Sequence, residues 1–158
     1  MRLESADVLD LFCCQGGATK GYQQAGLTVH GVDIDPQPRY IGDAFTQADV
    51  IEFLKRHMGE IRKRFRFIHA SPPCQFYSAT QVLQGNDHPD LIGPVRALLI
   101  ETGLPFVIEN VPDARSALRG PVTLCGAPFG LRTYRHRLFE TGGWVMAQPE
   151  HPAHTAPL

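Results

Sequence analysis

The sequence predicts an α/β protein built on a mostly parallel β-sheet, and two observations support this prediction. Short apolar runs alternate with amphipathic stretches along the chain, which is typical of repeated β-α units. Polar residues also follow directly after several of the apolar runs, as expected where ligands bind beyond the carboxyl ends of parallel strands. The chain has 158 residues, a length that fits a single domain with its own core.

The predicted elements follow this alternation in order. Strands are expected over residues 7–12, 29–33, 67–70 and 105–109, with a later one over 138–140. Helices are expected over residues 19–25, 50–65 and 90–101. The helix over 50–65 is the clearest, because its apolar residues recur every three or four positions and Asp49 with Glu52 forms a capping-box pattern. Its basic residues lie off that apolar stripe and indicate a solvated face rather than a nucleic-acid surface.

Composition and charge exclude several classes of protein. Fifteen Lys and Arg against sixteen Asp and Glu give a net charge of −1, which excludes a polycation that holds nucleic acid by bulk charge. No apolar run approaches the roughly 20 residues that span a bilayer, and the N-terminus lacks a signal-peptide pattern. We therefore expect a cytoplasmic protein that does not enter a membrane.

The cysteines and histidines do not predict a metal centre or a disulfide framework. The cysteines stand at positions 13, 14, 74 and 125, without the CxxC spacing of the usual zinc sites. His151 and His154 lie in the Pro- and His-rich end of the chain, which we expect to be frayed. Both could ligate a metal ion, but the expectation is that no metal is bound.

Two of the predicted strand ends carry features suited to a nucleoside ligand. The turn over residues 15–17 contains two glycines, which let a ligand approach the backbone closely. Asp33 follows about twenty positions later, where a carboxylate suits a ribose diol. The alternative is that Asp33 only shapes the turn before Pro36. The turn matches neither GxGxxG nor the P-loop pattern, so phosphate binding is not predicted.

The other strand ends carry candidate reactive groups. Cys74 follows two prolines that fix a rigid turn, so its thiol is a candidate nucleophile rather than a packed core cysteine. Glu109 is placed to transfer a proton or to hydrogen-bond a substrate, and the alternative is a helix cap or a loop ion pair. Arg135 and Arg137, two positions apart, would face one side of a strand and suit a phosphate or carbonyl oxygen, or simply lie on a solvated surface.

In this order, the segments together resemble the DNA cytosine-5 methyltransferases, and most closely the short phage-type DNA methylases. The resemblance rests on Asp10-Leu11-Phe12 with Gly16-Gly17, on Pro73-Cys74-Gln75 with Ser78, on Glu109-Asn110-Val111, and on Arg135 with Arg137. It extends over about residues 8–140. The chain departs from the family pattern at Cys14, where a glycine is usual, and at Thr133, where a glutamine is usual.

The resemblance implies a fold, a cofactor and an activity. The fold would be the Rossmann-like, mostly parallel sheet of an S-adenosylmethionine-dependent methyltransferase, with a single catalytic domain over residues 1–145 and a tail over 146–158. The enzyme would transfer a methyl group from S-adenosylmethionine to C5 of a cytosine flipped out of DNA, through a covalent adduct with a cysteine. DNA would be its partner, in a bacterial or phage-infected host cell.

The resemblance also implies site residues. By this resemblance, the catalytic residues would be Cys74, Glu109, Arg135 and Arg137. The residues that contact the cofactor would be Asp10, Phe12, Gly16, Gly17, Asp33, Ile34, Asp49, Val50 and Pro73. The residues that contact the substrate would be Gln75, Ser78 and Asn110. Phe12 and Ile34 would enclose the adenine, Asp33 would bind the ribose hydroxyls, and Asp49 would bind the adenine amine. Glu109 and Arg137 would contact the flipped base, while Arg135 would brace the nucleophile loop.

The family's target-recognition region and closing C-terminal segment are not found in the sequence. Three explanations are open: a minimal enzyme with little specificity, a truncated chain, or a partner chain that supplies the missing part. Two other functions are also open, namely a non-catalytic module with the same fold and a pyrimidine-C5 enzyme that acts on free nucleotides.

Overall fold

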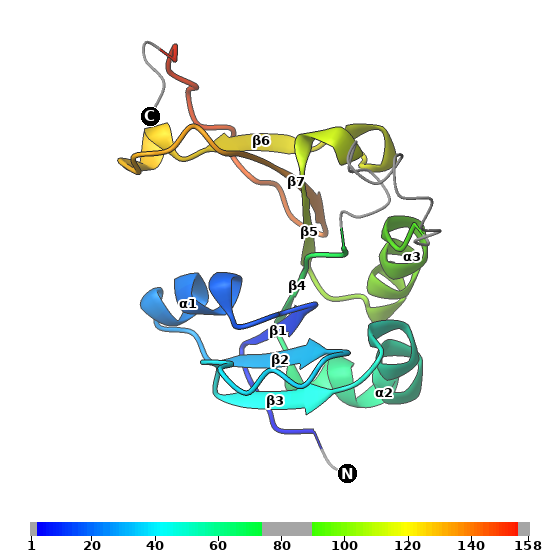
Figure 1. Cartoon of the computed structure of the whole chain (residues 1–158). Helices are drawn as coiled ribbons and strands as arrows, with labels where there is room; N and C mark the ends of the chain where they lie inside the picture. The colour runs from blue at the N-terminus through cyan, green and yellow to red at the C-terminus, as the bar shows by residue number, and fades with distance from the viewer. Residues whose placement is uncertain (1–2, 74–89, 155–158) are drawn as a thin grey trace, which may run out of the picture.

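A seven-stranded sheet forms the centre of the molecule in the computed structural model, which describes residues 3–73 and 90–154 (Figure 1). The strand order is β3-β2-β1-β4-β5-β7-β6. The strands are β1 (Val8–Leu11), β2 (Val29–Asp33), β3 (Ala44–Gln47), β4 (Phe67–Ala70), β5 (Phe106–Asn110), β6 (Val122–Cys125) and β7 (His136–Gly142). The first five are parallel to one another, and β7 is antiparallel to both β5 and β6.

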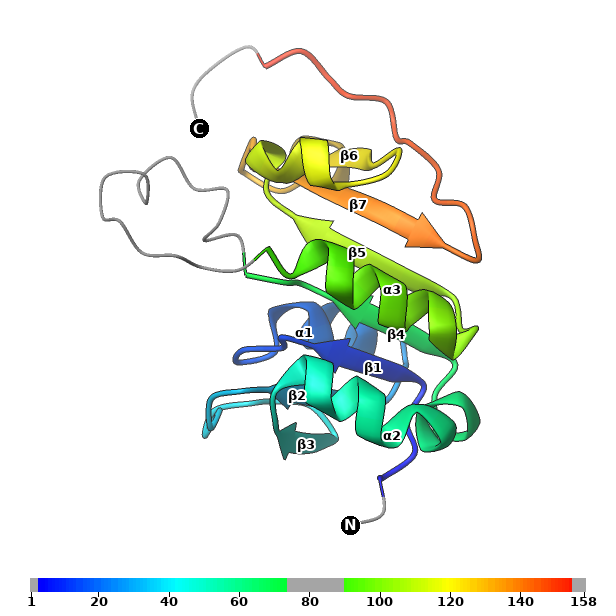
Figure 2. The same ribbon diagram turned by 90° about the vertical axis from the view of Figure 1, so that its right-hand side faces the viewer.

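The helices cover the two faces of the sheet unequally. They are α1 (Gly17–Gln24), α2 (Val50–Arg64) and α3 (Ile92–Thr102), with short 3-10 turns η2 (Pro112–Ala117) and η3 (Ala127–Phe129). Figure 2 shows α2 and α3 side by side on one face, and α1 lies alone on the other. Among the described residues, no α-helix covers the α1 face of the sheet beside β5, β7 and β6.

The core explains why these segments form strands. Every residue of β1 and of β2 is buried, as expected for parallel strands that are covered on both faces. Leu9, Leu11 and Ile68 belong to the apolar cluster, which also takes in the buried face of α2. The N-terminus of α2 begins as predicted, because the Asp49 side chain accepts a hydrogen bond from the Glu52 N–H at 3.0 Å. Each predicted helix and strand is confirmed within a few residues.

Two strands are absent from the sequence prediction. Both β3 and β6 lie at edges of the sheet and are only partly buried. An edge strand that contacts the core on part of one face needs no continuous apolar run, so its sequence carries a weaker signal.

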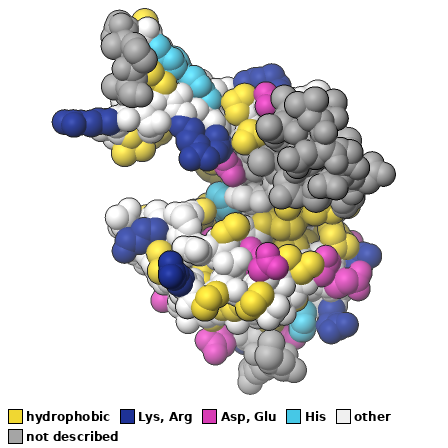
Figure 3. All heavy atoms as spheres, viewed as in Figure 1, with side chains coloured by type: hydrophobic (Ala, Val, Ile, Leu, Met, Phe, Trp, Pro, Cys, Tyr) yellow, Lys and Arg dark blue, Asp and Glu magenta, His cyan; other side chains and the backbone are white. Residues whose placement is uncertain are grey.

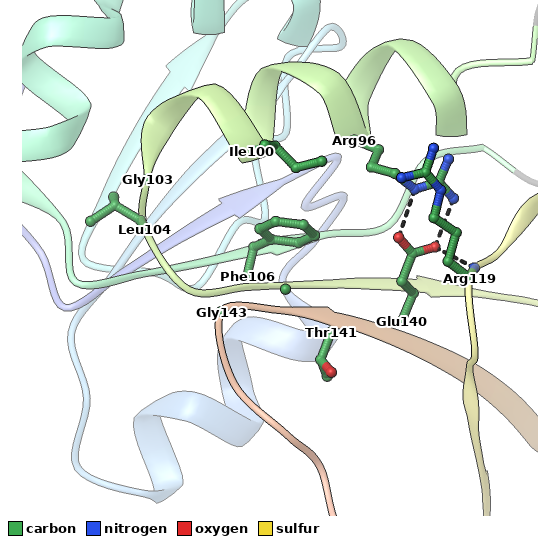
Figure 4. Close-up of a pocket in the computed structure, with 10 residues that line it drawn as sticks. Arg96, Ile100, Gly103, Leu104, Phe106, Arg119, Glu140, Thr141 and Gly143 are labelled. Atoms are coloured by element: carbon green, nitrogen blue, oxygen red, sulfur yellow. Dashed lines mark hydrogen bonds and ion pairs between the residues drawn. The ribbon is translucent and has the colours of Figure 1, made fainter.

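A buried ion pair joins α3 to β7. Arg96 Nε lies 2.6 Å from Glu140 Oε1, and Arg96 also donates to the Ala117 carbonyl at 2.6 Å. The Arg119 backbone N–H donates to the same Glu140 carboxylate at 2.8 Å. Figure 4 shows these groups around Glu140, beside a cavity of about 310 Å³ on the α3 side of the sheet. The ion pair fixes the position of β7, which carries further charged residues at its other end.

One side chain holds the segment after β7 to β6. The Gln148 side chain donates from Nε2 to the Thr123 carbonyl at 2.6 Å and accepts from the Thr123 N–H at 3.0 Å. The segment expected to be frayed, residues 149–158, begins directly after this contact. No helix in the described ranges is long and apolar enough to cross a membrane.

Candidate active site

The strand order reverses between β1 and β4, and ligands of open α/β sheets bind at such a point. β2 and β3 lie to one side of β1, whereas β4, β5 and β7 lie to the other. The polar segments that follow β1, β2, β4 and β5 consequently meet at one edge. β7 runs in the opposite direction, so its first residues reach this edge as well.

The turn after β1 has an unusual backbone. Phe12 and Cys14 have positive φ values of 61° and 47°, and Gly16 has a φ of 97°. A Cβ atom on Gly16 would lie 2.8 Å from Ile41, whereas one on Gly17 would meet nothing within 4 Å. Gly16 is thus required by conformation and space, and Gly17 leaves the start of α1 open to a ligand.

Asp33 anchors this turn from the end of β2. Its carboxylate accepts hydrogen bonds from the Cys14 N–H at 2.9 Å and from the Asp35 N–H at 3.0 Å, one on each oxygen. Both the ligand-binding and the turn-shaping interpretations of Asp33 remain compatible with this geometry, because each carboxylate oxygen has a second lone pair. The next residue, Ile34, is 61% exposed, so it offers an apolar surface at the same edge.

Asp10 lies beneath the turn rather than on its surface. It is buried, and it accepts a hydrogen bond from the Thr19 hydroxyl of α1 at 2.6 Å. Burial raises the pKa of Asp10 to about 6, against the smaller effect of the Thr19 hydrogen bond. Tyr40 joins the group through Thr19 at 3.1 Å. Asp10 therefore fixes α1 against β1. Its predicted part in a cofactor site would be to hold the turn and the helix in place.

Asp49 and Val50 follow β3 at the beginning of α2. Asp49 caps the helix, as predicted. The Val50 side chain is buried in the core cluster, so its side chain cannot lie on the surface of a ligand site.

The segment after β4 is held against β1 and β5. The Ser71 N–H donates to the Leu11 carbonyl at 3.1 Å. The Asn110 side chain is buried, donates to the Pro72 carbonyl at 3.0 Å and accepts from the Val111 N–H at 2.9 Å. The predicted substrate contact of Asn110 stays a prediction, while in this structure both ends of its amide hold the protein's own backbone. Asn110 positions the two prolines.

Pro73 is exposed at the end of this segment. The predicted nucleophile and two predicted substrate contacts, Cys74, Gln75 and Ser78, lie outside the described residues.

Glu109 and Arg137 form an ion pair across β5 and β7. Arg137 Nε lies 2.8 Å from Glu109 Oε1, with roughly a quarter of each side chain exposed. Burial raises the pKa of Glu109 above its usual value, while Arg137, a hydrogen bond from Ser71 and the charge of Arg135 each act to lower it. The ion pair named as an alternative for Glu109 is thus present, between two strands rather than in a loop, and it holds the carboxylate at the site.

The other predicted arginine lies just before β7. Arg135 is exposed, and its N–H donates to the Thr133 hydroxyl at 3.2 Å. Its expected contact with the nucleophile loop falls outside the described residues.

A buried histidine links the helix α1 to Glu109. The Tyr22 hydroxyl lies 2.8 Å from His69 Nδ1, and His69 Nε2 lies 2.9 Å from the Ser71 hydroxyl. Ser71 in turn hydrogen-bonds Glu109. Burial lowers the pKa of His69 to about 4, so the imidazole is neutral at physiological pH. This series of hydrogen bonds was not predicted from the sequence. The histidine inside the apolar run of β4 was a signal for it, because a buried histidine needs a polar partner.

These groups lie at the inner wall of a large cavity on the open face of the sheet. Its volume is about 1060 Å³. Figure 3 shows the corresponding hollow between the part that contains α1 and the part that contains β6 and β7. Polar groups come from His69, Ser71 and Glu109, and the apolar walls include Phe129 and Phe139. Such a site suits a flat, partly polar ligand.

The sheet order and the open edge define a class of protein: the chain has the fold of S-adenosylmethionine-dependent methyltransferases. One solved structure of this kind is the 1,6-didemethyltoxoflavin-N1-methyltransferase of Burkholderia thailandensis, with bound S-adenosylhomocysteine. It shares 18% sequence identity, with a TM-score of 0.51 over 87% of this chain and 70% of that one. The hypothetical protein TTHA0928 of Thermus thermophilus matches at 19% identity, with a TM-score of 0.54 over 87% of this chain and 74% of that one.

A curated relative is similar in sequence. The type II methylase M.HgiDII of Herpetosiphon aurantiacus is 29% identical over an aligned length of 128 residues, and the match covers 73% of this chain and 35% of the relative. The chain thus spans about a third of the length of that relative. No family model matches the chain.

Proposed function

We propose that this protein transfers a methyl group from S-adenosylmethionine to C5 of a cytosine in DNA. The observation that carries the proposal is Glu109, which lines the large cavity together with Ser71 and is paired with Arg137. A carboxylate with a raised pKa suits a reaction in which a thiol attacks a ring that must accept a proton or hydrogen bond. The likeness to a type II methylase supports DNA as the substrate.

The described residues fit the cofactor. No side chain of the described part caps the N-terminus of α1, so the N–H groups of its first turn can bind the carboxylate of an amino acid. Exposed Ile34 offers a face to adenine, and Asp33 retains lone pairs for the ribose hydroxyls. When bound, the cofactor supplies an electrophilic methyl group.

The protein's own groups supply the remaining chemistry. The Cys74 thiolate adds to C6 of the cytosine, and electron density builds at C5. Glu109 hydrogen-bonds N3 and the exocyclic amine, which stabilises the added charge. C5 takes the methyl group with release of S-adenosylhomocysteine. A base then removes the C5 proton and the C6–S bond breaks, so that the ring and the Cys74 thiolate are both restored. Arg137 holds Glu109 and compensates its charge.

The open cavity favours a base that has left the duplex. A flipped cytosine is flat, with one polar edge, and the cavity combines aromatic walls with polar groups on one side. The cavity has a volume of about 1060 Å³ and is open to one side. We propose that a target-recognition or closing segment, in a longer chain or a partner chain, covers it when DNA is bound.

The test is covalent trapping. The chain is incubated with S-adenosylmethionine and duplex DNA that carries 5-fluorocytosine, from which the C5 substituent cannot leave as a proton. We expect an adduct on denaturing gels and in intact mass spectra, absent in Cys74→Ala and strongly reduced in Glu109→Gln. Reactions without cofactor and with ordinary cytosine are the controls. A folded chain that yields no adduct contradicts the proposal that Cys74 of this chain attacks a cytosine in DNA.

Two measurements separate the other functions. Binding of S-adenosylmethionine without any adduct, on DNA or on nucleotide, identifies a non-catalytic module. Protection of Cys74 from alkylation by a cytosine mononucleotide, but not by duplex DNA, identifies an enzyme for free nucleotides. Protection by DNA alone supports the proposal.

A further inference from the structure

Three histidines and one cysteine converge at the end of the sheet formed by β6 and β7. Cys125 and His136 are direct partners in the antiparallel register, so their side chains project from the same face of the sheet. The segment after β7 returns past this point and adds His151 and His154. The candidate ligand atoms of all four residues lie within 4.8 Å of one another.

Two of the separations are close to those of a tetrahedral metal centre. Cys125 Sγ lies 3.6 Å from His154 Nε2, and His136 Nε2 lies 2.8 Å from His151 Nε2. Zinc bonds of about 2.3 Å to sulfur and about 2.0 Å to nitrogen place tetrahedral ligands about 3.6 Å apart for S–N pairs and about 3.4 Å apart for N–N pairs. The first distance fits directly, and the second needs the His136 and His151 imidazoles to separate by only about half an ångström.

We propose that Cys125, His136, His151 and His154 form a zinc site. One thiolate and three imidazoles are a donor set that suits zinc rather than magnesium or calcium, which prefer oxygen ligands. Four protein ligands complete a tetrahedron and leave no open position, so the site is structural rather than catalytic.

The ligands are held in place by contacts that involve no metal. The His154 ring stacks on Tyr134, with ring centroids 3.9 Å apart and planes 11° from parallel. His136 and His151 are also stacked, with centroids 5.0 Å apart. Gln148 fixes the same segment to Thr123 on β6. These contacts lower the ordering cost of binding, because the segment is already positioned.

The zinc site would fix the first residue of β7. His136 is followed directly by Arg137, whose side chain projects from the other face and meets Glu109. The Arg137 guanidinium also donates to the His136 carbonyl at 2.8 Å. A metal bound to His136 would therefore hold the backbone from which Arg137 reaches the proposed active site. The zinc site itself does not depend on the proposed methyl transfer.

The test measures metal binding by the untagged full chain, with no DNA or cofactor present. Metal is removed with a chelator, and zinc content is measured after equilibration and desalting. We expect one zinc per chain, with an affinity weakened roughly 10- to 100-fold or more in the double variant of His151→Ala with His154→Ala. Both histidines are exposed, so this variant is expected to fold. His57→Ala, on α2, is the matched control and is expected to bind zinc as the unchanged chain does.

Cobalt replaces zinc as a spectroscopic probe of the ligand set. We expect the visible spectrum of a tetrahedral centre and a thiolate-to-cobalt charge-transfer band. The band is lost in Cys125→Ser and is kept in Cys14→Ser, which removes an exposed thiol elsewhere. Circular dichroism checks that each variant is folded. A chain that binds no zinc, zinc binding that survives loss of both histidines, or a charge-transfer band that survives Cys125→Ser overturns the proposal.

Discussion

Asp10 on β1 and His69 on β4 are direct partners in the parallel register, and burial shifts their pKa values in opposite directions. The pKa of Asp10 rises to about 6, so the folded state prefers the protonated carboxyl. The pKa of His69 falls to about 4, so the folded state prefers the neutral imidazole. The two residues consequently change the stability of the protein with opposite signs over overlapping ranges of pH.

We predict that Asp10→Asn stabilises the protein at neutral pH. The folded pKa of Asp10 is about 6, above its ordinary value of 3.8. Because the folded state holds this proton more tightly, a protonated Asp10 stabilises the fold fully below pH 3.8. This stabilisation is lost as the pH rises to about 6. The loss amounts to about 3 kcal/mol. Asparagine keeps an acceptor for the Thr19 hydroxyl and does not titrate.

Urea unfolding of both proteins measures this difference. The free energy of unfolding of Asp10→Asn, relative to the unchanged protein, should increase between about pH 4.5 and about pH 7. Equal differences at the two pH values would show that Asp10 is not the buried acid that the structure describes.

We predict that Arg137→Gln raises the pKa of Glu109 further. Burial already raises this pKa, and the charge of Arg137 is the largest of the effects that oppose it. Loss of that charge leaves burial less opposed. The matched variant Arg135→Gln should give a smaller rise, since Arg135 is the weakest of the opposing effects.

Carbon-13 NMR of glutamate side chains measures both shifts. The Glu109 signal is assigned by its disappearance in Glu109→Gln. A Glu109 pKa that stays the same in Arg137→Gln would contradict the ion pair.

The glycines at positions 16 and 17 should respond differently to alanine. Gly16→Ala forces a Cβ onto a backbone with a φ of 97° and into contact with Ile41. We expect a loss of about 1–2 kcal/mol in the free energy of unfolding. Gly17→Ala meets open space in the first turn of α1 and should be neutral or stabilising. Thermal unfolding of the two variants compares them, and similar losses at both positions would contradict the geometry of the turn.

The buried ion pair between Arg96 and Glu140 should be costly to break from one side. Arg96→Met leaves the Glu140 carboxylate buried with too few partners, and we expect a loss of about 3–5 kcal/mol. The double variant of Arg96→Met with Glu140→Met removes the stranded charge and should recover much of this loss. Urea unfolding of the single and double variants measures the recovery. A double variant no more stable than Arg96→Met would contradict this account.

The sequence predicts the central strands well because strands buried on both faces consist almost entirely of apolar residues. The run over β4 is apolar except for His69, and β2 is buried along its whole length. The strand-end positions of Asp33 and Glu109 follow from the same runs. In contrast, β3 and β6 lie at edges and are only partly buried, so their sequences resemble loops.

Contacts that depend on strand order could not be predicted in this way. Glu109 meets Arg137 only because β7 enters the sheet beside β5 in the opposite direction. Asn110 looks like a free polar residue in sequence, yet its amide holds the Pro72 carbonyl. Cys125 and His136 become neighbours through the β6–β7 register, and no spacing rule for zinc ligands anticipates that pairing.

The contact between Gln148 and Thr123 also has a consequence for how molecules meet one another. β6 is an edge strand, paired only with β7 on one side, and the other side of such a strand exposes backbone groups that can recruit a strand from another molecule. The Gln148 amide occupies the N–H and the carbonyl of Thr123 as a neighbouring backbone would. The Gln148 side chain thus occupies the free edge of β6 at Thr123, and it disfavours pairing of that edge with a strand of another molecule.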